Sequence, residues 1–128
     1  MTPAKERNFE RLMSPKSIAF FGGTDVEVAI KEAQRRGFTG AIWPVNPNRQ
    51  EILGFKCYKS VNDLPKPPDA SFIAVPSRSV TSVVKMLSDC GAGGAVCYSA
   101  GFGETGDEGQ ALENELNLVT GDLALIGP

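Results

Sequence analysis

Five short apolar runs recur along the chain, and polar or helix-patterned segments separate them. The runs lie at residues 18–21, 41–45, 70–75, 94–98 and 123–126. The first four end abruptly in small or ring-constrained residues. Nearly continuous apolar runs of this length are typical of parallel strands that are buried on both faces of a sheet. The pattern therefore predicts five buried strands.

Apolar residues at helical spacing occur between most of these strands. The predicted helical stripes are Phe9, Leu12 and Met13; Val26, Ile30 and Ala33; Val80, Val83, Val84 and Leu87; and Leu112, Leu116 and Val119. We expect Asp25 to cap the second helix and a glycine to end each of the second and third helices. The first helix is expected to pack on an edge of the sheet. Residues 46–68 show no full helical pattern and contain two candidate single turns, at 51–53 and 60–64.

Strands that alternate with helices predict an α/β fold with a doubly wound, parallel, five-stranded Rossmann-like sheet and helices on both faces. With the strands numbered along the chain, we expect the order 3-2-1-4-5, which places a crevice at the carboxyl ends of strands 1 and 4. The length fits one domain, residues 1–128, with residues 1–14 as an N-terminal helical extension. A ligand would lie across the loops that follow the strands.

The charge composition argues against polyanionic partners. The chain carries 13 Lys and Arg against 15 Asp and Glu, with a sequence pI of about 5.1, so it lacks the basic field that attracts nucleic acid or an anionic membrane. No segment approaches the roughly 18 to 20 apolar residues of a membrane span, and the first ten residues have no signal-peptide character. We therefore expect a cytoplasmic protein without nucleic-acid or membrane partners.

Candidate catalytic groups are scarce in the sequence. The chain contains no histidine, and no carboxylate pair or cysteine cluster has an evident catalytic partner. The three cysteines lack the paired spacing of zinc ligands or redox motifs, which favours core thiols in a reducing compartment. Cys90 falls at a predicted helix C-terminus, where the helix dipole disfavours a thiolate. We therefore expect a crevice that binds a ligand, with no catalytic residue and no metal.

Two of the junctions suit a phosphate. Gly22-Gly23-Thr24 can bring backbone N–H groups close to a phosphate at a helix start, because no side chain blocks the approach. It equally fits a tight turn without ligand, since a full G-x-G-x-x-G fingerprint is absent. Asn46, Pro47 and Arg49 stand where an NAD-specific domain places a carboxylate. The positive charge of Arg49 favours a phosphorylated ribose as the ligand. Alternatively, the segment is a solvated loop without a ligand, and its prolines only set its path.

The other two junctions contribute small and ring-constrained residues. Val75 and Pro76 end the third strand, and Ser77 is placed to cap the next helix, which by itself explains this serine. The fourth strand leads into Ser99-Ala100-Gly101-Phe102. Small residues there leave space, and the Phe102 ring can flank a flat ring or an acyl arm. This fourth junction is therefore the one that most favours a ligand.

These junctions and the segments around them form a set with a characteristic order and spacing. The set comprises Ser14-Pro15-Lys16-Ser17-Ile18-Ala19, Gly22-Gly23, Gly37-Phe38-Thr39-Gly40, Trp43-Pro44-Val45-Asn46-Pro47, Ile52-Leu53-Gly54, Leu64-Pro65, Pro68-Asp69-Ala70, Ala74-Val75-Pro76, Ser99-Ala100-Gly101-Phe102-Gly103-Glu104 and Ile126-Gly127-Pro128. It resembles the N-terminal CoA-binding domain of the NDP-forming acyl-CoA synthetases, a family that includes the alpha subunit of succinyl-CoA synthetase. The resemblance covers nearly the whole chain.

This resemblance implies that coenzyme A is the ligand. It implies that Gly22-Gly23-Thr24 lies near the CoA phosphates and that Arg49 corresponds to a basic residue beside the nucleotide. It further implies that Val75-Pro76 packs near the adenine and that Ser99-Ala100-Gly101-Phe102 lines the pantetheine side. The family's commoner pattern has a longer first loop with a further glycine, whereas here Thr24 leads directly into the helix.

The resemblance also implies a role within a larger ligase. In this family a phosphoryl group passes through a histidine on a later domain, and an ATP-grasp module binds the nucleotide; this chain contains neither. We therefore expect a fragment of a longer polypeptide that contributes the CoA site of an ATP-dependent, ADP-forming acyl-CoA synthetase, an acid–thiol ligase. The phosphohistidine and ATP-grasp domains would belong to the same or a partner chain, and a homo-oligomer is compatible with this role. The alternatives are a stand-alone CoA-binding regulatory module and an NADP-binding Rossmann domain.

Overall fold

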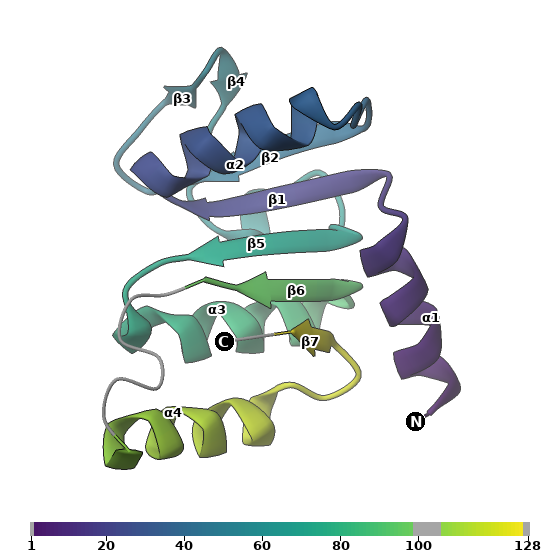
Figure 1. Cartoon of the computed structure of the whole chain (residues 1–128), viewed down its shortest axis with the longest axis vertical. Helices are drawn as coiled ribbons and strands as arrows, with labels where there is room; N and C mark the ends of the chain where they lie inside the picture. The colour runs from purple at the N-terminus through teal and green to yellow at the C-terminus, as the bar shows by residue number, and fades with distance from the viewer. Residues whose placement is uncertain (1, 99–105, 127–128) are drawn as a thin grey trace.

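A computed structural model describes residues 2–98 and 106–126 of the chain. The helices are α1 (Pro3–Met13), α2 (Thr24–Arg35), η1 (Val61–Asp63, a 3-10 turn), α3 (Ser77–Cys90) and α4 (Gly106–Val119). The strands are β1 (Ser17–Gly22), β2 (Ala41–Val45), β3 (Glu51–Ile52), β4 (Phe55–Lys56), β5 (Ala70–Ala74), β6 (Gly94–Cys97) and β7 (Ala124–Ile126). Figure 1 shows how helices and strands alternate along the chain.

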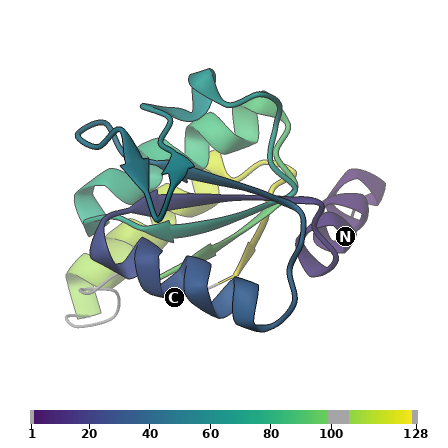
Figure 2. The same ribbon diagram turned by 90° about the horizontal axis from the view of Figure 1, so that it is seen from above.

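Five parallel strands form the central sheet in the order β2-β1-β5-β6-β7. The α2 helix packs on one face, where Phe20 and Ile42 meet Val26 and Ile30 in one core cluster. The α3 and α4 helices pack on the other face in a second core cluster. Figure 2 shows α2 and α3 on opposite sides of the sheet. The predicted α/β class, the five parallel strands and the helices on both faces are confirmed.

The predicted strand order was wrong. In chain numbering we expected 3-2-1-4-5, but the observed order is 2-1-3-4-5, with β5 directly beside β1. The chain segment that follows β2 returns along the outer side of β2, where Tyr58 forms a parallel bridge with Val45. The Asn46 N–H donates to the Tyr58 carbonyl at 2.9 Å, and the Tyr58 N–H donates to the Pro44 carbonyl at 2.8 Å. This segment therefore occupies the position beside β2 that we had expected β5 to take.

Contacts at both ends of β1 hold β5 against it. At the amino end, the Asp69 carboxylate accepts from the Lys16 N–H at 2.9 Å, and the Asp69 N–H donates to Ser17 Oγ at 3.1 Å. At the carboxyl end, Gly22 has φ +140° and pairs in register with Ala74. A Cβ at Gly22 would lie 2.4 Å from the Ala74 carbonyl oxygen, so only glycine allows this approach. The pairing of β1 with β5 thus depends on particular side chains rather than on apolar pattern.

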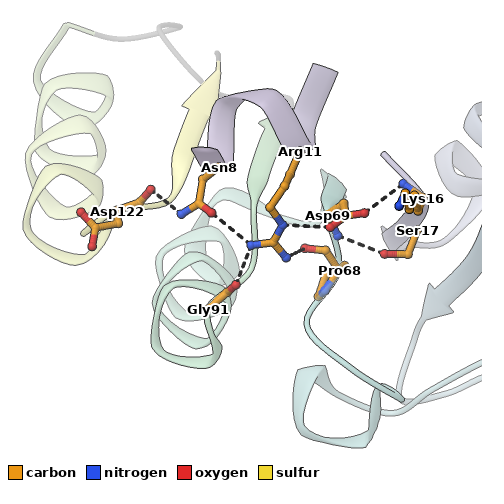
Figure 3. Close-up of polar contacts among 8 residues, drawn as sticks. All are labelled: Asn8, Arg11, Lys16, Ser17, Pro68, Asp69, Gly91 and Asp122. Carbon is orange, nitrogen blue, oxygen red and sulfur yellow. Dashed lines mark hydrogen bonds and ion pairs between the residues drawn. The ribbon is translucent and has the colours of Figure 1, made fainter. Parts of the chain in front are cut away.

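The α1 helix lies across the amino ends of β5, β6 and β7, and not on a sheet edge as we expected (Figure 1). Arg11 attaches it there, because Arg11 Nε donates to Asp69 Oδ1 at 2.8 Å and Arg11 Nη1 donates to the Gly91 carbonyl at 2.9 Å. The buried Asn8 donates to the Asp122 carbonyl at 2.9 Å. Figure 3 shows this group of polar contacts. An apolar stripe predicts the helix, but hydrogen bonds decide where it docks.

The segment between β2 and β5 differs partly from expectation. Residues 51–53 were predicted as a helical turn, but Glu51–Ile52 and Phe55–Lys56 form a two-stranded antiparallel hairpin. Leu53 and Gly54 have φ values of 52° and 84°, the left-handed conformation that a two-residue hairpin turn requires. The single turn expected within 60–64 is confirmed as η1. Among the described residues, no helix is both long and apolar enough to cross a membrane.

Candidate functional site

The carboxyl ends of β2, β1 and β5 lie side by side. Phe21 pairs in register with Val45, and Gly22 pairs with Ala74. Three of the four predicted junctions therefore meet at one edge of the sheet. Chain connections reverse direction between β1 and β5, since β2 lies on one side of β1 and the later strands on the other. Such a switch point is where open α/β sheets bind ligands. It lies between β1 and β5, and not between the first and fourth strands of the sheet as we expected.

The loop after β1 brings the start of α2 to this switch point. Gly23 is the N-cap residue of α2, with Thr24 as the first helical residue and no side-chain cap. The prediction that Asp25 caps this helix was wrong, because Asp25 lies inside the first turn. A Cβ added at Gly23 would meet no heavy atom within 4 Å among the described residues. The space beside the Gly23 Cα is therefore open among the described residues, and a helix start with this kind of space suits an approaching phosphate.

The junction after β5 places a second helix start nearby. Pro76 is the N-cap residue of α3, with no side-chain cap, and Ser77 is already helical. The expectation that Ser77 caps α3 was therefore wrong. The first turn of α3 contains no acidic residue. Because α2 and α3 leave the neighbouring strands β1 and β5 toward opposite faces (Figure 2), the positive ends of both helix dipoles flank the switch point. In α2, Asp25 and Glu27 in the first turn offset part of this positive charge.

Val75 and Pro76 differ in exposure. Val75 is half-buried and packs against the core cluster beneath α3, whereas Pro76 is exposed at the end of the strand. The fourth predicted junction, Ser99-Ala100-Gly101-Phe102, lies outside the described residues. Tyr98, directly before it, is exposed and stacks on Phe72 with ring centroids 6.3 Å apart.

Asn46 fastens the loop after β2 to the loop after β1. Its Nδ2 donates to the Gly22 carbonyl at 2.9 Å, and its Oδ1 accepts from the Asn48 N–H at 2.8 Å. The side chain thus holds the two loops together. Pro47 is exposed, and its carbonyl accepts from Lys59 Nζ at 3.3 Å. Lys59 was not among the predicted site residues, because no residue spacing indicates that its side chain returns beside residues 46–49.

The side chain of Arg49 extends from this loop to α2. Its Nη1 and Nη2 atoms are both 3.4 Å from Glu27 Oε1. The side chains of Arg49 and Glu27 are 40% and 35% exposed. A guanidinium at the crevice, still reachable from solvent, can meet a phosphate group. Glu27 was not among the predicted site residues.

The thiols provide no activated nucleophile in the described part of the chain. Burial raises the pKa of the Cys97 thiol to about 11, and burial also raises the pKa of Cys57 and of Cys90. All three are free thiols, and Cys57 and Cys97 are buried. Cys90 is the last residue of α3, as predicted. No cluster of three or more His, Cys, Asp or Glu within residues 2–98 and 106–126 has metal-binding geometry.

The chain is similar to a known domain family and to several curated proteins. A family described as CoA binding domain matches residues 16–120. The ADP-forming acetate–CoA ligase I of Archaeoglobus fulgidus is 40% identical over 124 residues, which cover 93% of this chain and 18% of that protein. The alpha subunit of the ADP-forming acetate–CoA ligase II of Pyrococcus furiosus is 35% identical over 125 residues, or 90% of this chain and 26% of that protein.

A solved structure has the same arrangement of elements. The dinucleotide-forming acetyl-coenzyme A synthetase 1 of Ca. Korarchaeum cryptofilum, in complex with phosphate and ADP, superposes with a TM-score of 0.79 at 32% identity. The match covers 94% of this chain and 27% of that chain. The chain therefore spans about a fifth to a quarter of the length of these relatives. It belongs to the CoA-binding domain family, is homologous to one part of the ADP-forming acyl-CoA synthetases, and has coenzyme A as its ligand.

Proposed function

We propose that the domain holds CoA across the carboxyl ends of β2, β1 and β5 and presents its thiol within an ADP-forming acyl-CoA synthetase. The observation that carries this proposal is the switch point between β1 and β5, where two helices without side-chain caps begin on opposite faces of the sheet. CoA is long and carries several phosphates, so it suits a crevice with two positive helix ends and a nearby guanidinium.

Each part of the crevice suits a different part of CoA. Gly22-Gly23-Thr24 and the start of α2 would receive a phosphate, because the space beside Gly23 is open. Arg49 would meet the ribose phosphate. Val75-Pro76 with Ser77 would border the adenine, and Ser99-Ala100-Gly101-Phe102 the pantetheine arm. Asn46 and Pro47 would shape the wall between the first two loops, as the hydrogen bond from Asn46 to the Gly22 carbonyl supports.

Activation of the acid would take place elsewhere in the ligase. The described residues offer neither an activated thiol nor a metal cluster, and the sequence contains no histidine to carry a phosphoryl group. We propose that phosphohistidine and ATP-grasp domains, in the same or a partner chain, supply that chemistry; one relative is named as an alpha subunit, which supports a partner chain. The chain alone would bind CoA without forming an acyl-CoA.

Calorimetry tests the position of the nucleotide. The protein is titrated with CoA, with dephospho-CoA and with NADPH as a control ligand. We expect CoA to bind more tightly than dephospho-CoA, and the Arg49→Ala variant to lose about 1 to 2 kcal/mol of CoA affinity. This is below the full value of a buried charged hydrogen bond, because Arg49 is 40% exposed. Equal affinity for CoA and dephospho-CoA would place the ribose phosphate away from Arg49, and absence of CoA binding would overturn the proposal.

A further inference from the structure

The ion pair between Arg49 and Glu27 is loose. Both Nη atoms of Arg49 approach a single carboxylate oxygen, Glu27 Oε1, at 3.4 Å. Charge-assisted N–H···O bonds are typically about 2.7 to 2.9 Å, and the strong arginine–carboxylate pairs use both oxygens. Both side chains also remain more than a third exposed. This geometry describes a contact that water or another anion can replace.

The other ion pairs of the described residues are closer. On the same helix, Glu32 lies 2.6 Å from Arg35 and 2.8 Å from Arg36. At the opposite end of the sheet, Arg11 and Asp69 are 2.8 Å apart. Arg49 is thus the arginine whose recorded carboxylate partner is held least tightly. It lies beside the switch point, where the first turn of α3 also contains an arginine, Arg78, for which no carboxylate contact is recorded among the described residues.

Charges of both signs act on this corner of the crevice. Lys59 Nζ donates to the Pro47 carbonyl. The positive charges of Arg49 and Lys59 and the negative charge of Glu51 all act on the thiol of the nearby Cys57. On the side of α2, Asp25 and Glu27 occupy the first helical turn. Glu27 therefore neutralises part of the positive charge that would otherwise attract an anionic ligand.

We propose that Glu27 is a specificity-determining residue, an internal counter-ion that competes with the ribose phosphate of CoA for Arg49. This inference rests on the proposed function, because it takes Arg49 as the group that meets that phosphate. When CoA binds, the guanidinium exchanges the loose carboxylate contact for the phosphate oxygens. Glu27 lowers CoA affinity and leaves ligands without the ribose phosphate unaffected.

The test compares four variants with the wild type. Glu27→Gln removes the competing charge while keeping the size of the side chain. Glu32→Gln is the matched control, because it removes the same charge from the same helix at a carboxylate that pairs with Arg35 and Arg36. Arg49→Ala and the Glu27→Gln/Arg49→Ala double variant complete the cycle. Each protein is titrated calorimetrically with CoA and with dephospho-CoA at about 20 mM salt, where screening is weak. Thermal unfolding of each variant reports on folding.

We expect Glu27→Gln to bind CoA about two- to fivefold more tightly, which is the range of an exposed ion pair. Its affinity for dephospho-CoA should stay within about twofold of wild type, as should both affinities of Glu32→Gln. In the Arg49→Ala background the Glu27→Gln gain should disappear. The melting temperature of Glu27→Gln should match that of wild type, because the side chain is partly exposed.

The inference is overturned by weaker CoA binding of Glu27→Gln, by an equal gain with dephospho-CoA, or by a gain that persists without Arg49. If Arg49→Ala abolishes the preference for CoA over dephospho-CoA while Glu27→Gln changes nothing, the inference fails and the proposed function stands. If wild type binds neither ligand, the proposed function fails, and the inference fails with it.

Discussion

Ser17 and Ser71 are both buried, with 2% of each residue exposed, but they differ in hydrogen bonding. Ser17 Oγ accepts from the Asp69 N–H at 3.1 Å. Ser71 Oγ finds no hydrogen-bond partner among the described residues. A buried polar group without a partner lowers stability, because it loses its hydrogen bonds to water and gains none in the protein. The two hydroxyls therefore make opposite contributions to the stability of the fold.

We predict that Ser71→Ala raises the free energy of unfolding by about 1 kcal/mol, because it removes the unpaired hydroxyl from the core. Ser17→Ala is the matched control and should lower this free energy by about 1 to 2 kcal/mol, since it leaves the Asp69 N–H without its acceptor. Urea unfolding followed by circular dichroism measures both values. Equal destabilisation by the two substitutions would show that the Ser71 hydroxyl has a partner in solution.

At the scale of elements, the Asp69 carboxylate connects α1 to the sheet. It accepts from Arg11 Nε and from the Lys16 N–H, and so joins α1, the start of β1 and the start of β5 (Figure 3). Burial by itself would raise the pKa of Asp69. The hydrogen bonds from Arg11 and Lys16, together with the charges of Arg11 and Lys66, outweigh that effect and hold the pKa below its ordinary value of 3.8.

The sign of this shift predicts an effect of pH on stability. Because the pKa of Asp69 is lowered on folding, its contribution is fully present above about pH 4 and is lost as the pH falls through the folded-state pKa. Asp69→Asn should lower the free energy of unfolding at pH 7 by about 1 to 2 kcal/mol, and by less at acidic pH. Urea titrations at several pH values from 7 downward measure the difference. A loss of stability in Asp69→Asn that does not vary with pH would show that the substitution acts through packing and not through charge.

At the scale of the whole molecule, the proposed site involves loops from both halves of the sheet. The loop after β2 is fastened to the loop after β1 by Asn46, and β5 contributes the start of α3. A ligand that contacts all three loops binds only the folded chain, so its binding energy adds to the stability of the fold.

We predict that CoA raises the stability of the domain by about 2.7 kcal/mol at a free concentration 100 times its dissociation constant. The melting temperature should rise with CoA concentration, and more than with an equal concentration of dephospho-CoA. Differential scanning calorimetry measures both curves. NADPH serves as the control ligand and should give the smaller shift expected of a non-cognate nucleotide. A shift independent of which ligand is added would argue for non-specific anion binding.

Much of the site could be predicted from the sequence because its residues directly follow strands. Gly22 and Pro76 lie at the ends of apolar runs, and an apolar run that ends in such a residue indicates where a strand stops. Parallel strands bring their carboxyl ends to one edge, so these junctions were expected to meet. Lys59 was missed because the bridge between Tyr58 and Val45 brings it to the site. Glu27 was missed because its contact with Arg49 spans 22 residues of chain.

The sequence by itself determined the elements and the α/β class, because apolar runs and helical stripes act within a few residues of chain. It also determined the family, through the order and spacing of its junctions. Only the tertiary structure decided the strand order. Buried strands of similar composition pair equally well in several orders, and the choice depends on long-range contacts: Asp69 with Lys16 and Ser17, Gly22 with Ala74, and Tyr58 with Val45. For the same reason only the tertiary structure placed the switch point at β1 and β5 and paired Arg49 with Glu27.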